Sequence, residues 1–120
     1  MAKSLDSRTI FITGSGGVLG TTYVRYMLEA GAKVVATDLL GARADALQDT
    51  FDENPNFVFY DLDVGDEGQV KEIFKRVVAD GHQPNVVLNN AAITGEMLMG
   101  AGESFPDFAG TSLEDWEKTI

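Results

Sequence analysis

The sequence predicts an α/β fold in which a doubly wound parallel sheet is covered by helices on both faces. Short β-branched runs alternate with segments of helical periodicity along the 120 residues. The runs are apolar almost throughout, which is typical of strands in a parallel sheet that is buried on both sides. Right-handed crossovers between such strands place helices on both faces of the sheet. A chain of this length fits one domain, residues 1–120.

The expected elements follow one another as β-α-β-α-β-α-β-loop-α. Gly31 stops the first helix, and the turn signals at 54–56 and 81–84 end the second and third helical segments. The expected strands are residues 9–13, 33–38, 57–60 and 85–89. The expected helical segments are residues 18–30, 42–51 and 70–78, then a surface loop over 94–110 and a capping box at 111–114 that opens a further helix.

Helical spacing also predicts which side chains the helices bury. The third helix is expected to bury Val70, Ile73, Phe74, Val77 and Val78. The first is expected to bury Val18, Leu19, Thr22, Tyr23, Tyr26, Met27 and Ala30. The fourth strand is apolar throughout and would be an exposed edge if no strand followed it, so we expect the sheet to be incomplete at its C-terminal side.

Composition and charge exclude several classes of partner and site. The formal net charge is −10 and the nine Lys and Arg residues are scattered, so a nucleic-acid partner is not expected. The chain has no cysteine, which excludes a disulfide, a zinc-thiolate site and a cysteine nucleophile, and no metal site is expected. Neither a signal peptide nor an apolar run of membrane-spanning length is present, which favours a cytoplasmic protein without membrane contact.

The most informative segment is the glycine-rich loop at residues 13–20, between the first strand and the first helix. Glycine permits a tight turn, close approach of a ligand to the backbone, and close packing of the helix on the strand. The helix N-terminus adds unpaired N–H donors and a partial positive charge, which suit the pyrophosphate of a dinucleotide. A glycine-rich turn without a ligand is the alternative. The candidate cofactor-binding residues are Gly14, Ser15, Gly16, Gly17, Val18, Leu19 and Gly20.

Asp38 ends the second strand and indicates which dinucleotide is bound. A carboxylate at this place accepts hydrogen bonds from the hydroxyls of the adenosine ribose and repels a 2′-phosphate, so it favours NAD over NADP. Leu39 follows directly, and no Lys or Arg stands in the glycine loop to hold a phosphate. Arg43 is the nearest cation along the chain, and we interpret it as a solvated helix residue.

Four features in this order resemble the N-terminal part of the short-chain dehydrogenase/reductase family. They are the 13–20 loop, Asp38, the pair 63–64 after the third strand and the segment 89–92 after the fourth. The resemblance implies a Rossmann-type fold in which Asp63 accepts from the adenine amino group and Val64 flanks the ring. It also implies that Asn90 and Ala91 line the cofactor near its ribose, while Asn89 ties neighbouring loops and strands together. A turn or capping role is the alternative for Asp63.

The resemblance leaves the subclass open. The glycine spacing TGxxGxxG is typical of the longer members that modify nucleotide sugars, whereas the Asn-Asn-Ala segment is typical of the shorter dehydrogenases. Ala92 stands where the shorter members usually have glycine.

The catalytic groups that the resemblance implies are absent from the 120 residues. The family's acid/base tyrosine and its lysine form a Tyr-x-x-x-Lys motif, and no lysine follows Tyr23, Tyr26 or Tyr60 at that spacing. We assign the three tyrosines to structure, read the single histidine, His82, as exposed in a turn, and expect the serine, tyrosine and lysine to follow residue 120.

The expected function is therefore the cofactor-binding part of an NAD-dependent oxidoreductase that acts on a hydroxyl or carbonyl group of a small molecule. The intact protein is expected to form a homo-oligomer. Two alternatives remain: an NAD-dependent epimerase or dehydratase of nucleotide sugars, and a dinucleotide-binding module without catalysis.

Overall fold

The fold is a four-stranded parallel sheet with helices on both faces, which confirms the predicted α/β class. The computed structural model describes residues 4–92, 112–114 and 117. The sheet order is β3-β2-β1-β4. The strands are β1 (Thr9–Ile12), β2 (Lys33–Asp38), β3 (Phe57–Asp61) and β4 (Val86–Leu88), and the helices are α1 (Val18–Glu29), α2 (Ala42–Phe51) and α3 (Glu67–Ala79).

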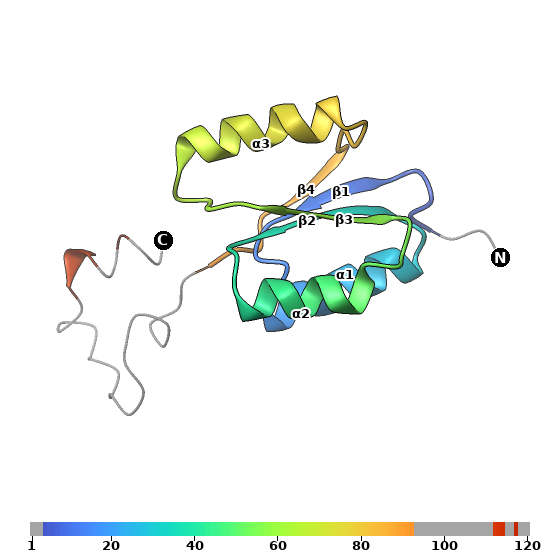
Figure 1. The fold of residues 1–120 in the computed structure, drawn as a ribbon, viewed down its shortest axis with the longest axis horizontal. Coiled ribbons are helices and arrows are strands. Elements are labelled where there is room, and N and C mark those ends of the chain that lie inside the picture. The colour runs from blue at the N-terminus through green and yellow to red at the C-terminus, as the bar shows by residue number, and fades with distance from the viewer. Residues whose placement is uncertain (1–3, 93–111, 115–116, 118–120) are drawn as a thin grey trace.

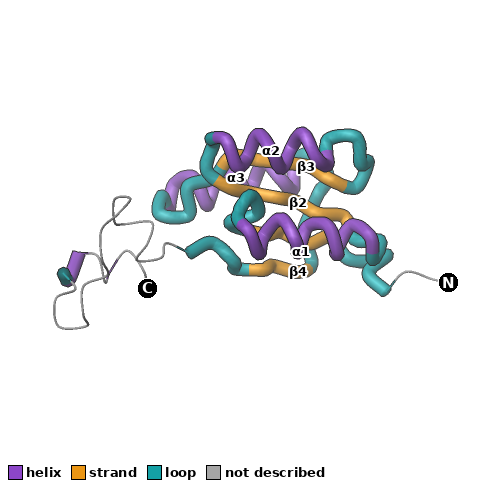
Figure 2. The backbone as a smooth tube through the Cα atoms, turned by 90° about the horizontal axis from the view of Figure 1, so that it is seen from below, coloured by secondary structure: helices purple, strands orange, loops and turns teal. Residues whose placement is uncertain are grey.

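The helices form one layer on each side of the sheet. α1 and α2 lie together on one face and α3 covers the opposite face (Figure 1). Seen from below, α2 lies on the β3 side of its layer and α1 lies toward β4 (Figure 2). β2 and β3 lie on one side of β1, whereas β4 lies on its other side. A crevice is expected at this change in strand order, where the loops after β1 and β4 diverge.

Alternating side chains of the strands supply two separate cores, because successive residues of a strand point to opposite faces. Under α1 and α2 the buried residues are Ile10, Ile12, Val24, Leu28, Ala32, Val34, Ala36, Leu47, Phe51 and Phe57. Under α3 they are Phe11, Val35, Tyr60, Leu62, Ile73 and Val77. Ile73 and Val77 were both predicted, whereas Val78 is exposed.

The buried face of α1 differs from the prediction. Its buried residues are Gly20, Val24 and Leu28, while Val18 is 85% exposed and Tyr26 is 64% exposed. The cause is Gly20, because a Cβ there would collide with the Gly14 carbonyl oxygen. The helix is therefore rotated so that its glycine, not its largest apolar side chains, faces the loop.

β4 lies at the edge of the sheet in the described part of the chain, which is the arrangement expected if no strand follows it. It pairs with β1 alone within the described part of the chain, and Val87 is 50% exposed. The strand is shorter than the predicted 85–89. Asn85 lies just before it, where its backbone N–H donates to the Thr9 carbonyl and its Oδ1 accepts from the Thr9 N–H, both at 3.0 Å.

Two helices end in a glycine with positive φ, as the glycine signals predicted. Gly31 has φ 95° and Gly81 has φ 84°. After α3, the Gly81 N–H donates to the Val78 carbonyl and the His82 N–H donates to the Val77 carbonyl, which is a Schellman motif. This motif folds His82 back over the helix end, so His82 is half-buried and the prediction of an exposed histidine is wrong.

The predicted 94–110 loop lies outside the described residues, and only part of the 111–114 capping box lies within them. Leu113, Glu114 and Glu117 are helical. No helix in the described part of the chain is both long and apolar enough to cross a bilayer.

Candidate dinucleotide site

The carboxyl ends of the four parallel strands bring the predicted site residues to one edge of the sheet. The glycine loop follows β1, Asp38 ends β2, Asp63 follows β3, and Asn90 follows β4. These segments are far apart in sequence, and the parallel topology alone places them side by side.

Two glycines of the loop are required by its close packing. Gly14 has φ 64°, a left-handed conformation that favours glycine, and a Cβ there would lie 2.8 Å from the Ala91 Cα. Gly20 allows α1 to pack closely on the loop, because a Cβ at this position would collide with the Gly14 carbonyl oxygen. The loop is therefore held between α1 on one side and the segment after β4 on the other.

Gly17 differs from these two glycines. It is the N-cap of α1 with φ −74° and ψ 177°, an extended conformation that any residue adopts. A Cβ at Gly17 would meet only the Gly14 carbonyl oxygen, at 3.5 Å, which is ordinary van der Waals contact. Nothing in the described protein requires glycine here, so the space beside Gly17 is open to a ligand.

The first turn of α1 offers unpaired donors beside Gly17. The N-cap provides no side-chain hydrogen bond, and the first turn carries no acidic residue. The backbone N–H groups of Val18, Leu19 and Gly20 donate to no acceptor within residues 4–92. Free N–H groups at the positive end of a helix dipole suit an anion, and a pyrophosphate has this chemistry.

Ser15 has a structural role in the loop. Its side chain is fully buried, and its Oγ donates to the Thr37 carbonyl at 2.9 Å. Its backbone N–H donates to the same carbonyl at 3.1 Å. The Thr37 hydroxyl in turn donates to the Ile12 carbonyl at 2.8 Å. The Ser15 hydroxyl and backbone N–H thus both bond the loop to β2, so the side chain has no remaining donor for a ligand.

Asp38 lies against the glycine loop. Its Oδ2 accepts from the Gly16 N–H at 2.8 Å, and its Oδ1 accepts from the Leu39 N–H at 2.7 Å. The carboxylate is half-buried and next to Gly16, so it stands where the loop meets the end of β2. A ribose linked to a pyrophosphate on the loop would come within reach of this carboxylate.

The segment after β4 is tied to the loop through Asn90. The Asn90 Nδ2 donates to the Gly14 carbonyl at 3.1 Å. The backbone N–H groups of Asn90 and Ala91 both donate to the Thr13 Oγ1, at 3.1 and 3.0 Å. The sequence assigned the tying role to Asn89, but Asn89 is exposed and its side chain makes no hydrogen bond within residues 4–92. This role belongs to Asn90, two residues beyond Leu88.

Asp63 and Val64 lie in a turn that the start of α3 holds in place. The Asp63 Oδ1 accepts from the Gly65 N–H at 2.9 Å, which is the turn role weighed as an alternative. The Asp63 N–H donates to the Gln69 Oε1 at 3.1 Å. This turn leaves the Val64 side chain 51% exposed.

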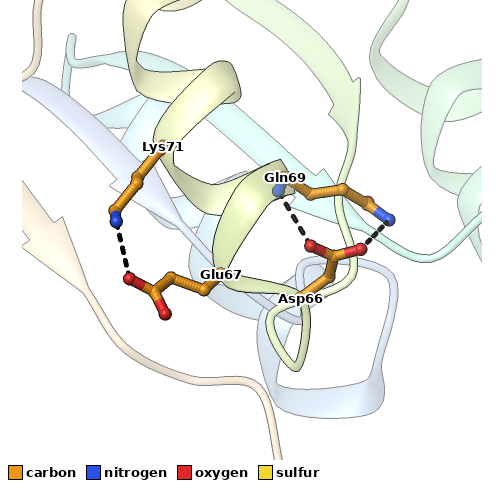
Figure 3. Close-up of polar contacts among 4 residues, drawn as sticks. All are labelled: Asp66, Glu67, Gln69 and Lys71. Atoms are coloured by element: carbon orange, nitrogen blue, oxygen red, sulfur yellow. Dashed lines mark hydrogen bonds and ion pairs between the residues drawn. The ribbon is translucent and has the colours of Figure 1, made fainter.

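Gln69 is itself fixed by the N-cap of α3. The Asp66 Oδ1 accepts from the Gln69 N–H at 3.1 Å, and the Gln69 Nε2 donates to the Asp66 Oδ2 at 3.2 Å (Figure 3). The neighbouring ion pair between Lys71 and Glu67 is fully on the surface, so it contributes little. Gln69 therefore links the helix start to the Asp63 backbone, a relationship that no sequence motif indicated.

Thr13 and Leu39 are site residues that the sequence analysis did not assign. Thr13 opens the loop motif and accepts two N–H groups, so a hydroxyl at the end of β1 was the available signal. Leu39 is 60% exposed and follows Asp38 directly. The available sequence signal was a leucine directly after Asp38 at the end of a strand, where loops of a parallel sheet hold ligands.

The three tyrosines are either hydrogen-bonded or exposed, and the described residues contain no metal ligand set. The Tyr60 hydroxyl donates to the Asp80 Oδ2 at 2.7 Å. Burial, together with that hydrogen bond, raises the pKa of Tyr60 to about 12, so this phenol keeps its proton. Tyr23 and Tyr26 lie on the exposed side of α1. Among the described residues no three histidine, aspartate or glutamate side chains are grouped to hold a metal ion.

Known proteins resemble this chain in sequence and in structure. The model of the family described as short chain dehydrogenase matches residues 8–120. The 3-oxoacyl-[acyl-carrier-protein] reductase FabG of Thermotoga maritima is 29% identical over 117 residues, which cover 97% of this chain and 44% of that protein. A putative short-chain dehydrogenase from Novosphingobium aromaticivorans has a TM-score of 0.74 at 26% identity, over 92% of this chain and 38% of that one.

A third similar structure contains a cofactor. It is a short chain dehydrogenase from Leptospira borgpetersenii with bound NAD+, with a TM-score of 0.69 at 18% identity over 96% of this chain and 39% of that one. The chain thus spans less than half the length of each of these relatives. The family match covers nearly the whole chain, and the chain belongs to the short-chain dehydrogenase family.

Proposed function

We propose that the chain is the NAD-binding part of an oxidoreductase that moves hydride between nicotinamide and a hydroxyl or carbonyl carbon of a small molecule. The observation that carries this proposal is the set of N–H groups in the first turn of α1 that have no acceptor within residues 4–92, next to Gly17 and Asp38. A pyrophosphate needs such donors, and a ribose needs such a carboxylate. The Leptospira relative with bound NAD+ supports the same cofactor class.

Different residues of the chain would bind different parts of the dinucleotide. The backbone of Val18, Leu19 and Gly20 would hold the pyrophosphate, and the bare Cα of Gly17 would admit it. Asp38 would accept from the ribose hydroxyls. The exposed Leu39 and Val64 follow neighbouring strands and would flank the adenine. The Asp63 Oδ2, which accepts no hydrogen bond within residues 4–92, would be available to the adenine amino group.

When bound, the nicotinamide supplies or accepts the hydride. The chain's own part is to hold and orient the dinucleotide, because Asn90 and Ala91 fix the loop from the β4 side. Proton transfer to the substrate oxygen needs a further group, since Tyr60 is tied to Asp80 and the Tyr-x-x-x-Lys motif is absent from the 120 residues.

The preference for NAD over NADP follows from Asp38. A 2′-phosphate would lie next to a carboxylate whose two oxygens are already fixed by backbone N–H groups and cannot turn away. Two negative charges at that separation repel strongly in a partly buried site.

The test is a calorimetric titration of the 120-residue chain with NAD and with NADP, beside an assay of the longest natural form of the protein with NAD and simple alcohols and ketones. Saturable binding that is tighter for NAD supports the cofactor assignment. If neither NAD nor NADP binds, the cofactor assignment is wrong. Binding without turnover on any hydroxyl or carbonyl substrate would favour the module without catalysis.

One observation favours the second enzyme class, an NAD-dependent epimerase or dehydratase of nucleotide sugars. The glycine spacing TGxxGxxG is more typical of the longer family members that modify nucleotide sugars. NAD that stays bound through many turnovers of a nucleotide sugar, without net reduction, would support an epimerase or dehydratase in place of the dehydrogenase.

A further inference from the structure

Both carboxylate oxygens of Asp38 accept hydrogen bonds from backbone N–H groups of the chain itself. Oδ2 accepts from Gly16, which is 22 residues earlier in the chain, and Oδ1 accepts from the adjacent Leu39. The two distances, 2.8 and 2.7 Å, are in the range of charge-assisted hydrogen bonds. The carboxylate therefore joins the glycine loop after β1 to the end of β2.

The packing around Gly16 fits this hydrogen bond to Asp38. Gly16 is half-buried, and its N–H has no acceptor other than Asp38 within residues 4–92. A Cβ on Gly16 would lie 3.0 Å from the Asp38 Oδ2 and 3.2 Å from the Arg43 carbonyl oxygen. A side chain at position 16 would thus displace either the carboxylate or the first turn of α2. The carboxylate and the glycine depend on each other.

We propose that Asp38 is a positioning residue for the glycine loop, in addition to the ribose acceptor that the proposed function, on which this inference rests, requires. An ionised carboxylate has about four lone-pair sites on its two oxygens. Two of these sites are taken by Gly16 and Leu39, which leaves one on each oxygen for the 2′- and 3′-hydroxyls of a ribose. The same group holds the pyrophosphate-binding backbone in place and reads the sugar beside it.

This double role has a consequence that ribose recognition alone lacks. Removing the carboxylate should weaken the binding of a nucleotide that has no ribose hydroxyls at all, because the Gly16 backbone loses its anchor. It also makes Gly16 a determinant of cofactor choice, since a side chain at this position would crowd the Asp38 oxygen that faces the ribose.

The first test uses the ligand-free chain. The Gly16 amide is followed by NMR hydrogen exchange in the wild type, in Asp38→Ala and in Asp38→Asn, with circular dichroism to establish that each variant is folded. We expect exchange at Gly16 to accelerate about tenfold in Asp38→Ala, as for the loss of a hydrogen bond to a charged group, and less in Asp38→Asn, which keeps one acceptor oxygen. The Ser15 amide, bonded to Thr37, serves as the internal control.

Asp61→Ala is the matched control variant. Asp61 is the register partner of Asp38 on β3, and its exposed side chain makes no hydrogen bond or ion pair within residues 4–92. It removes the same charge from the same edge without touching the loop. Equal Gly16 exchange in Asp38→Ala and Asp61→Ala would overturn the positioning role.

The second test measures binding of ADP and of 2′,3′-dideoxy-ADP by calorimetry to the wild type, Asp38→Ala and Asp61→Ala. Both alanine variants lose one negative charge near an anionic ligand, so their comparison cancels that effect. We expect Asp38→Ala to bind dideoxy-ADP severalfold more weakly than Asp61→Ala does, and to lose still more for ADP. Equal dideoxy-ADP affinity in the two variants would show that Asp38 acts on the ribose alone.

The two tests separate this inference from the proposed function. If the wild-type chain binds neither nucleotide, the proposed function fails, and Gly16 exchange in the ligand-free protein alone decides whether Asp38 holds the loop. If the nucleotides bind and Gly16 exchange is insensitive to Asp38, the proposed function stands and the positioning role is wrong.

Discussion

The Asn90 side chain donates to the Gly14 carbonyl oxygen at 3.1 Å and so fastens the end of β4 to the turn after β1. These two segments flank the point where the sheet order changes direction, and 76 residues separate the bonded pair. Asn89, its neighbour, makes no side-chain hydrogen bond within residues 4–92. Of these adjacent asparagines, Asn90 joins the segments after β1 and β4, whereas Asn89 makes no such bond within residues 4–92.

Asn90→Ala is expected to destabilise the protein by about 1 kcal/mol, the usual value for one lost intramolecular hydrogen bond. NAD affinity should fall as well, because Gly14 loses the bond that fixes the loop. Urea unfolding followed by circular dichroism and a cofactor titration measure the two effects. Asn89→Ala is the control and should stay within about 0.5 kcal/mol of the wild type. Equal effects of the two substitutions would contradict this assignment.

The loop glycines provide a second matched pair, Gly17→Ala and Gly20→Ala. A Cβ on Gly20 would collide with the Gly14 carbonyl and lie 2.7 Å from the Ser15 Cα, so this variant should lose about 1–3 kcal/mol or more of stability. Gly17→Ala meets no such obstacle and should change stability by less than about 1 kcal/mol. It should nevertheless weaken NAD binding about tenfold, because the methyl group occupies the space in which the pyrophosphate approaches.

Thermal unfolding and cofactor titration of both variants decide the matter. Retained NAD affinity in a folded Gly17→Ala protein would show that no ligand approaches Gly17, and the dinucleotide site would have to lie elsewhere on the sheet edge.

Local signals predicted most of the fold. β2 and α2 begin and end where the sequence indicated, because apolar runs and turn residues bound them on both sides. The Gly31 and Gly81 stops were readable for the same reason, since positive φ selects glycine at helix ends.

The predictions that were wrong concern features set by contacts between segments that are distant in sequence. The rotation of α1 is set by the contact of Gly20 with Gly14, and a hydrophobic pattern that contains Tyr23 and Tyr26 carries no information about it. His82 was read from its polar neighbours, yet the Schellman bonds fold it over the end of α3.

The candidate site shows the same division. The positions of the glycine loop and Asp38 were visible in the sequence, because each follows a strand directly. The bond between the Gly16 N–H and Asp38, the choice of Asn90 over Asn89, and the link from Gln69 to Asp63 were not, since each depends on which side chains the sheet register brings together.

Asp38→Ala is expected to shift cofactor preference toward NADP. NAD loses its ribose acceptor, whereas NADP also loses a repulsive charge beside its 2′-phosphate. Any disturbance of the Gly16 backbone is common to both cofactors and cancels in the ratio of their affinities. We expect this ratio to change about tenfold, the equivalent of about 1.4 kcal/mol. Parallel titrations with NAD and NADP measure it, with Asp61→Ala as the control for charge; an equal loss for both cofactors would show that another carboxylate faces the ribose.

Tyr60 gives the fold a dependence on alkaline pH. Burial and the hydrogen bond to Asp80 raise its pKa from 10.0 to about 12. The folded state therefore holds the phenolic proton more tightly than the unfolded chain does. The resulting stabilisation is fully present below pH 10 and is lost as the pH rises toward 12.

Tyr60→Phe should remove this dependence and about 1 kcal/mol of stability at neutral pH, because the hydrogen bond to Asp80 is lost. Urea unfolding of the wild type and the variant at pH 7, 9 and 11 measures the difference at each pH. We expect the gap between the two proteins to narrow above pH 10, since only the wild type loses the contribution of the protonated phenol. Tyr26→Phe, on the exposed side of α1, is the control and should leave the pH profile unchanged. A gap that stays constant from pH 9 to 11 would mean that the Tyr60 hydroxyl titrates alike in the folded and unfolded chains.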